Sequence, residues 1–114
     1  MQPRELHYLL DMLNAAKLAQ DFVAGITWEM FQTDLMRQAA VTRQIEIIGE
    51  AARRISETTQ AELPDIPWRD MIGMRNRIVH EYDRVNLEII WNVTQVSIPQ
   101  LILSIEPLIP PEEP

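Results

Sequence analysis

The chain contains no cysteine, only 3 glycines and a single lysine, Lys17. Because cysteine is absent, disulfide bonds, thiolate zinc sites and cysteine nucleophiles are excluded. The sequence also lacks any run of about 18 apolar residues, the length that a membrane-spanning helix needs. No apolar signal core follows its first charged residues. We therefore expect a cytoplasmic protein with no membrane partner.

Metal and cofactor signatures are missing as well. His7 and His80 lie far apart, and neither has neighbours at the spacing of metal ligands. There is no glycine-rich loop of the kind that cradles phosphates. The sequence thus predicts no metal site and no cofactor.

The length of 114 residues and the hydrophobic content of 46% are typical of one small globular domain. The chain is too short for a barrel enzyme or a two-domain dehydrogenase. We assign residues 1–109 to a single helical domain. Residues 110–114 contain only proline and glutamate, and we expect them to form a flexible tail.

Apolar side chains recur at steps of three and four residues over 6–23 and again over 41–55. This periodicity predicts two amphipathic helices. Gly25 suits the C-terminal cap of the first helix, and Thr27 and Thr33 are candidate N-caps for the turns that follow.

The second stripe has heptad spacing, which suits packing against a partner helix. A homodimer through a helix face would produce it, and so would a tight monomeric core. Gly49 lies within this stripe and costs about 1 kcal/mol relative to alanine in a helix interior. The close approach of another helix would offset that cost.

The second helix should end at residues 60–63, because prolines follow. Asp65 is a candidate N-cap for a further helix, with Pro67 in its first turn. Asn86 is a candidate N-cap for the last helix, in which Pro99 should produce a kink. No stretch alternates with the period of two that is typical of strands. The sequence predicts an all-α, up-and-down bundle of four to five helices.

The net charge of −7 should repel nucleic acid at long range. The charge is uneven, because residues 85–114 contain no lysine or arginine. Residues 69–84, in contrast, contain four arginines, Arg69, Arg75, Arg77 and Arg84, against the three acidic residues Asp70, Glu81 and Asp83. Any anion-binding site should therefore lie in this middle stretch. A solvated helix face would give the same pattern.

Arg75, Asn76 and His80 are candidate residues of a catalytic site. Asn76 and His80 are four residues apart and share a helix face, so the amide can fix the orientation of the imidazole. Arg75 precedes His80 by five residues, which on an ideal helix points the two about 140° apart. The length of the guanidinium, or a partner chain, would bridge that gap. Histidine exchanges protons near neutral pH and arginine binds phosphate, so the pair suits RNA cleavage without a metal.

A structural interpretation of the same stretch stays open. A histidine near a helix C-terminus commonly serves as a cap or dipole partner. Arg77 and Glu81 have the spacing of an ordinary surface ion pair. Tyr82 by itself suits packing, and we assign His7 a structural role.

The stretch resembles the signature of the HepT-like family of HEPN-domain proteins, R-x4-H-x-Y. Arg75, His80 and Tyr82 match that signature, and an asparagine follows the arginine as in the family. Two further family-like stretches are residues 43–52 and residues 67–74. The three stretches have the order and the spacing that they have in the family.

The resemblance implies a HEPN helical bundle that works as a homodimer, with Arg75 and His80 of both protomers meeting in a cleft. It implies a metal-independent ribonuclease that cleaves tRNA or mRNA, supported by Asn76 and Arg77. It also implies the toxin of a prokaryotic, type VII-like toxin–antitoxin system. The antitoxin would be a minimal nucleotidyltransferase that transfers AMP to Tyr82. The added bulk and negative charge beside His80 would exclude RNA.

Two other hypotheses stay open. In the first, the chain is a non-catalytic subunit of a nucleotidyltransferase complex, and Arg75 and His80 hold a nucleotide or phosphate. The acidic net charge favours it. In the second, the chain is a structural dimerisation protein, which gives no reason for a tyrosine two residues after His80.

Overall fold

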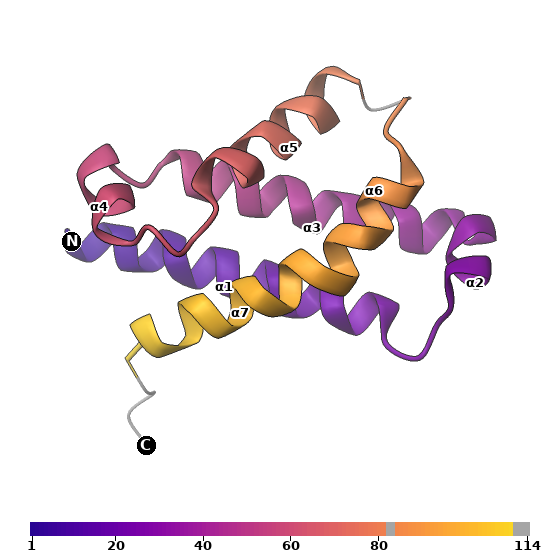
Figure 1. The fold of residues 1–114 in the computed structure, drawn as a ribbon, viewed down its shortest axis with the longest axis horizontal. Coiled ribbons are helices and arrows are strands. Elements are labelled where there is room, and N and C mark those ends of the chain that lie inside the picture. The colour runs from indigo at the N-terminus through magenta and orange to yellow at the C-terminus, as the bar shows by residue number, and fades with distance from the viewer. Residues whose placement is uncertain (82–83, 111–114) are drawn as a thin grey trace.

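Residues 1–81 and 84–110 are described by a computed structural model, and this part of the chain is helical and has no strand (Figure 1). The elements are α1 (Pro3–Val23), α2 (Trp28–Thr33), α3 (Leu35–Arg53), α4 (Glu57–Glu62), α5 (Trp68–His80), α6 (Leu87–Asn92), the π-helical turn η1 (Val93–Ser97), α7 (Ile98–Ile105) and the 3-10 turn η2 (Glu106–Leu108). The all-α class is confirmed. Residues 82–83 and 111–114, which include Tyr82 and most of the expected tail, lie outside the described residues.

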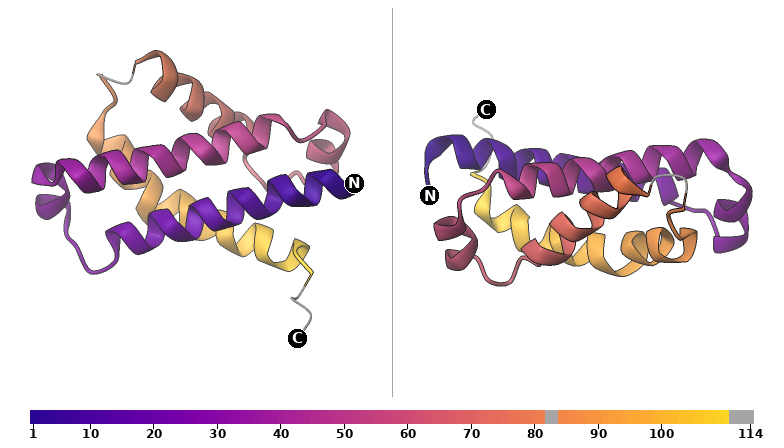
Figure 2. Two further views of the ribbon diagram at one scale, coloured as in Figure 1. Left: turned by 180° about the vertical axis from the view of Figure 1, so that it is seen from behind. Right: turned by 90° about the horizontal axis from the view of Figure 1, so that it is seen from above.

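The helices form two layers (Figure 2). Helices α1 and α3 lie side by side and antiparallel in one layer (Figure 1). In the other layer, α5 packs on α3, and the continuous run of α6, η1 and α7 packs largely on α1. Helix α3 therefore contacts both α1 in its own layer and α5 in the other layer. It supports α5, the helix that carries the candidate site. None of the described helices combines the length and the apolar character that a bilayer crossing requires.

The predicted apolar stripes form the core between these layers. In α1, Leu9, Met12, Leu13, Ala16, Ala19 and Val23 are buried. In α3, Val41, Ile45, Ile48 and Ala52 are buried, as the heptad spacing predicts. The C-terminal run adds Ile90, Ile98, Leu101 and Ile105. Burial of these side chains supplies most of the free energy that holds α3 in place.

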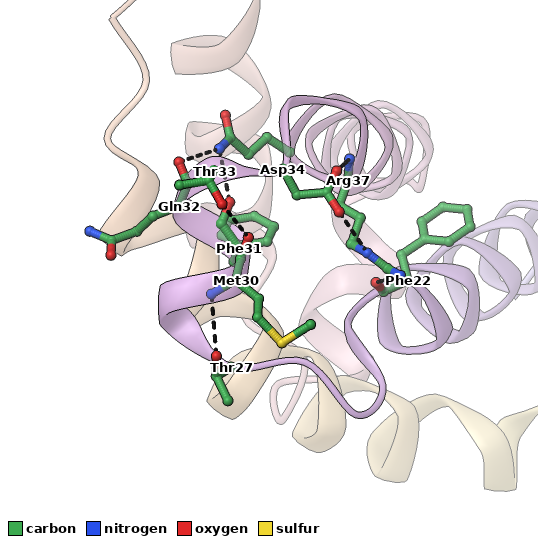
Figure 3. Close-up of polar contacts among 9 residues, drawn as sticks. Phe22, Thr27, Met30, Phe31, Gln32, Thr33, Asp34 and Arg37 are labelled. Carbon is green, nitrogen blue, oxygen red and sulfur yellow. Dashed lines mark hydrogen bonds and ion pairs between the residues drawn. The ribbon is translucent and has the colours of Figure 1, made fainter.

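Polar contacts fix the start of α3 (Figure 3). Thr27 caps α2 as predicted, because its hydroxyl oxygen accepts a hydrogen bond from the Met30 amide at 3.2 Å. The N-cap of α3, however, is Asp34 and not Thr33. The Asp34 carboxylate accepts bonds from the backbone amide and the Nε of Arg37, at 3.0 and 2.9 Å. A carboxylate that binds both groups is a stronger cap than a hydroxyl.

The expectation of an unbroken helix to residues 60–63 was wrong. Helix α3 ends at Arg53 and a separate helix, α4, begins after Ser56. The Ser56 hydroxyl accepts a bond from the Thr59 amide at 3.2 Å, and the Glu5 carboxylate accepts one from the Ser56 amide at 3.0 Å. The interruption is stabilised by a side chain of α1, which local periodicity does not report.

Helix α5 also starts later than expected. Its N-cap residue is Pro67, with non-helical backbone angles, rather than Asp65. The loop before it is closed by Trp68, whose Nε1 donates to the Leu63 carbonyl at 3.0 Å. At the last helix, Asn86 is the N-cap as predicted, and its Oδ1 accepts from the Glu88 amide at 2.8 Å.

The expected kink at Pro99 takes another form. The turn before it, η1, is π-helical, and the Ile98 amide donates to the Val93 carbonyl five residues earlier. Pro99 is the second residue of α7, where the ring of a proline in a regular α-helix would clash with the carbonyl four residues earlier. The wider turn therefore accommodates the proline within a continuous helical run.

Candidate functional site

Arg75 emerges from the seam between α5 and α3. The residue is half-buried, whereas Asn76 and Arg77 next to it are exposed. The Arg75 Nη1 donates a hydrogen bond to the Asn76 Oδ1 at 3.1 Å. The Arg75 Nε is buried and has no hydrogen-bond partner among the residues that the structure describes. The guanidinium is thus held at its base and leaves further donors for an anion.

The seam is tight because of a glycine on α3. A Cβ added at Gly49 would lie 2.5 Å from the Met71 carbonyl oxygen and would collide with the Cβ of Arg75. The close helix approach expected at Gly49 is therefore confirmed, and the partner helix is α5. Sequence reasoning did not identify this partner, because nothing local to Gly49 indicates which helix crosses it.

His80 is the last residue of α5 and is exposed. The following residue, Glu81, ends the helix by donating its amide to the Arg77 carbonyl at 2.8 Å. The predicted bond between Asn76 and His80 is not present among the described residues, and Asn76 instead holds Arg75. The arginine side chain is long enough to reach the adjacent Asn76. Asn76 therefore contacts Arg75, although it shares a helix face with His80.

The positive charge of this stretch is not neutralised by direct pairing within the described part of the chain. The ion pairs found there involve His7, Lys17, Arg37 and Arg43. The surface pair considered for Arg77 and Glu81 does not form. Arg69, Arg77 and Arg84 are exposed together with His80. Asp70 and Glu81 are exposed on the same stretch, so the arginines leave only a small local excess of positive charge in a molecule that is acidic as a whole.

A groove runs beside the C-terminal half of α5. The α3–α5 groove is lined by Leu35, Gln38, Ala39, Thr42, Arg43, Glu46, Ile78, Val85 and Leu87. Glu46 in this groove forms an ion pair with Arg43, with 3.2 Å between the Glu46 Oε1 and the Arg43 Nη1. Glu50, one turn later on α3, lines a separate hollow with Tyr8 and Asp11 of α1. Of these two carboxylates, only Glu46 lies on the side of the candidate site.

The other candidate residues lie elsewhere. His7 is exposed on α1 and lies 3.8 Å from Asp11, remote from α5 in sequence and structure. Tyr82 follows α5 but lies outside the described residues. Within residues 1–81 and 84–110, no group of three or more histidine, cysteine or acidic side chains is arranged to hold a metal ion.

This geometry provides a cation fixed in a helix seam and a proton-exchanging group at the exposed end of the same helix. Residues 12–108 match the family described as "Ribonuclease HepT-like". The chain therefore belongs to the HepT-like ribonuclease family of helical HEPN domains.

Individual relatives agree. The chain is 38% identical, over 82% of its length and 86% of the relative, to a probable ribonuclease HepT of Thermococcus cleftensis. It is 35% identical to a putative RNase of Methanocaldococcus jannaschii, over 90% of the chain and 84% of that protein. A putative RNase of Caldanaerobacter subterraneus is 32% identical over 93% of the chain and 95% of its own length. No solved structure is significantly similar to the chain.

Proposed function

We propose that the chain is a metal-independent endoribonuclease in which Arg75 and His80 act on an RNA phosphodiester. The observation that carries the proposal is their arrangement on α5, with a half-buried, tethered guanidinium and an imidazole at the open end of the helix. Membership of the HepT-like ribonuclease family and the names of the relatives support it.

The reaction follows from these groups. His80 takes the proton of a ribose 2′-hydroxyl, whose oxygen attacks the adjacent phosphorus. Arg75 stabilises the additional negative charge that develops on the phosphoryl oxygens. The bond from phosphorus to the 5′-oxygen breaks, and a second imidazole returns a proton to that oxygen. The products are a 2′,3′-cyclic phosphate and a 5′-hydroxyl, and no water or metal is consumed in this step.

The second imidazole comes from a second copy of the chain in this proposal. Arg75 and His80 point about 140° apart on one helix, so two α5 helices that face one another bring the arginine of one close to the histidine of the other. The α3–α5 groove supports such a docking surface, because it lies beside the end of α5 and is lined by Leu35, which is 76% exposed. Apolar surface of this kind is commonly covered in an assembly.

The regulation proposed for this ribonuclease is that of a toxin neutralised by a partner. A minimal nucleotidyltransferase antitoxin would transfer AMP from ATP to the Tyr82 hydroxyl and release pyrophosphate. The adenylyl group would add bulk and a negative charge two residues from His80, which would repel the RNA backbone. The position of Tyr82 in the family signature supports this step, and tRNA or mRNA is the expected substrate.

The test is cleavage of total RNA and tRNA in EDTA by purified protein. We expect new fragments with the wild type and with His7→Ala, a control that removes the remote histidine. We expect none with Arg75→Ala or His80→Ala, although both variants remain helical by circular dichroism. Cleavage by His80→Ala at the wild-type rate would contradict the proposal.

A non-catalytic subunit that binds a nucleotide is the second candidate, and the net charge of −7 favours it. Wild-type protein with unmodified Tyr82, confirmed by mass spectrometry, that binds ATP or phosphate but leaves every RNA intact would support this candidate. Growth inhibition in cells without the nucleotidyltransferase would contradict it.

A further inference from the structure

Gly49 of α3 lies against the turn of α5 that carries Arg75. A Cβ at this position would collide with the Arg75 Cβ, would lie 2.5 Å from the Met71 carbonyl oxygen and would come within 3.2 Å of the Arg75 Cγ. Two of these atoms belong to Arg75. The third is the carbonyl to which the Arg75 amide donates in the regular α-helical pattern, four residues back.

These contacts leave little freedom at the root of the arginine side chain. A collision with a flexible side-chain end is relieved by rotation, but a carbonyl oxygen and a Cβ move only when the helix moves. Beyond the Cγ, the Arg75 Nε is buried and the Nη1 is tethered to Asn76. The direction in which the guanidinium leaves the seam is therefore set where its stem rests on Gly49.

We propose that Gly49 is a positioning residue for the catalytic arginine. The missing side chain lets the Arg75 Cβ rest directly on α3, and this contact sets the direction in which the guanidinium leaves the seam between α3 and α5. The proposal rests on the proposed function of Arg75. A methyl group at residue 49 pushes the turn of Met71 to Arg75 away from α3 and misaligns the guanidinium with the developing charge.

The chain offers a matched control on α5 itself. Gly73 is also a helical glycine, two residues before Arg75, but a Cβ built there meets nothing within 4 Å. Gly73→Ala therefore makes the same chemical change, glycine to alanine inside a helix, without touching the seam. Because alanine favours helix over glycine, this variant also provides a more stable background.

The experiment measures steady-state cleavage, in EDTA, of an RNA that the wild type cuts. It compares the wild type, Gly49→Ala, Gly73→Ala and the double variant, at a temperature where circular dichroism shows each protein fully folded. We expect kcat of Gly49→Ala to fall by about tenfold or more, because displacements of about 1 Å in an active site have effects of that order. KM should change by less than about twofold, since the interaction lost is one made in the transition state. Gly73→Ala should keep the wild-type kcat.

A loss of folded protein alone would lower the apparent enzyme concentration and would disappear when rates are compared at full folding. A fully folded Gly49→Ala protein with wild-type kcat would overturn the proposal, and so would an equal loss in Gly73→Ala. If neither Gly49→Ala nor the double variant folds, Gly49 is required for folding rather than for placing Arg75, and the proposal is also overturned. If the wild type itself cleaves no RNA, the proposed function fails first and this inference fails with it.

Discussion

The Arg75 guanidinium is tethered to its own neighbour: Nη1 donates to the Asn76 Oδ1 at 3.1 Å. Asn76 is exposed and makes no other side-chain hydrogen bond among the described residues. The amide therefore acts on the orientation of Arg75 and not on the packing of the helix.

Replacing Asn76 by alanine should consequently affect catalysis and not folding. Loss of one such hydrogen bond corresponds to about 1 kcal/mol, or roughly a fivefold lower kcat for RNA cleavage. The free energy of unfolding in urea should stay within about 0.5 kcal/mol of the wild type. A variant with unchanged kcat would show that the tether has no role in the reaction.

The two helical glycines should respond to alanine with opposite signs in stability. Gly73→Ala should raise the free energy of unfolding by about 0.5–1 kcal/mol, because alanine loses less backbone entropy in a helix and meets no neighbour there. Gly49→Ala should lower it by about 1–3 kcal/mol, the usual cost of overpacking. Urea titrations of both variants check this, and equal shifts would contradict the tight seam.

Stability in acid should depend on Glu5. Its buried carboxylate accepts bonds from the Thr59 hydroxyl and the Ser56 amide, which together lower the pKa of Glu5 from 4.5 to about 2. A carboxyl with a depressed pKa in the folded state contributes stability that is complete above its unfolded pKa. That contribution should be lost as the pH falls from about 4.5 to 2.

The measurement compares urea unfolding of wild type and Glu5→Gln from pH 7 to pH 2. The wild type should be more stable at pH 7, and the difference should shrink across that window. Glu62→Gln, which changes an exposed carboxylate on α4, should show no comparable convergence. A difference that stays constant down to pH 2 would contradict the role assigned to Glu5.

The cap of α3 gives a further test, because its two candidate residues are adjacent. Asp34→Ala should lower the free energy of unfolding by about 1 kcal/mol or more, since it removes the cap and frees Arg37. Thr33→Ala should change it by less than about 0.5 kcal/mol. Thermal or urea unfolding of the pair checks the assignment, and the reverse order would contradict it.

These contacts also indicate what the sequence could predict. The stripes of α1 and α3 follow the helical period, and Thr27 and Asn86 cap helices through bonds to amides two or three residues away. Such features are local, so the sequence contains them. The interruption between α3 and α4 at Ser56 is not a local feature, because it is stabilised by Glu5 in the first turn of α1.

The sequence named candidate residues for the site but not their contacts. The pattern from Arg75 to His80 suggested a proton-exchanging group near a phosphate-binding one. The spacing of Asn76 suggested a bond to His80, whereas the structure shows one to Arg75. The glycine at 49 indicated a helix crossing, but only the fold shows that the crossing lies against Arg75. Which helices meet depends on packing of the whole core, which periodicity alone does not determine.

The most direct test of the account is mass spectrometry of the RNA ends that wild type and His80→Ala produce in EDTA. The mechanism through Arg75 and His80 predicts fragments with 2′,3′-cyclic phosphate and 5′-hydroxyl ends from the wild type, and intact RNA with His80→Ala. Fragments with 3′-hydroxyl and 5′-phosphate ends, or the same fragments from both proteins, would contradict it.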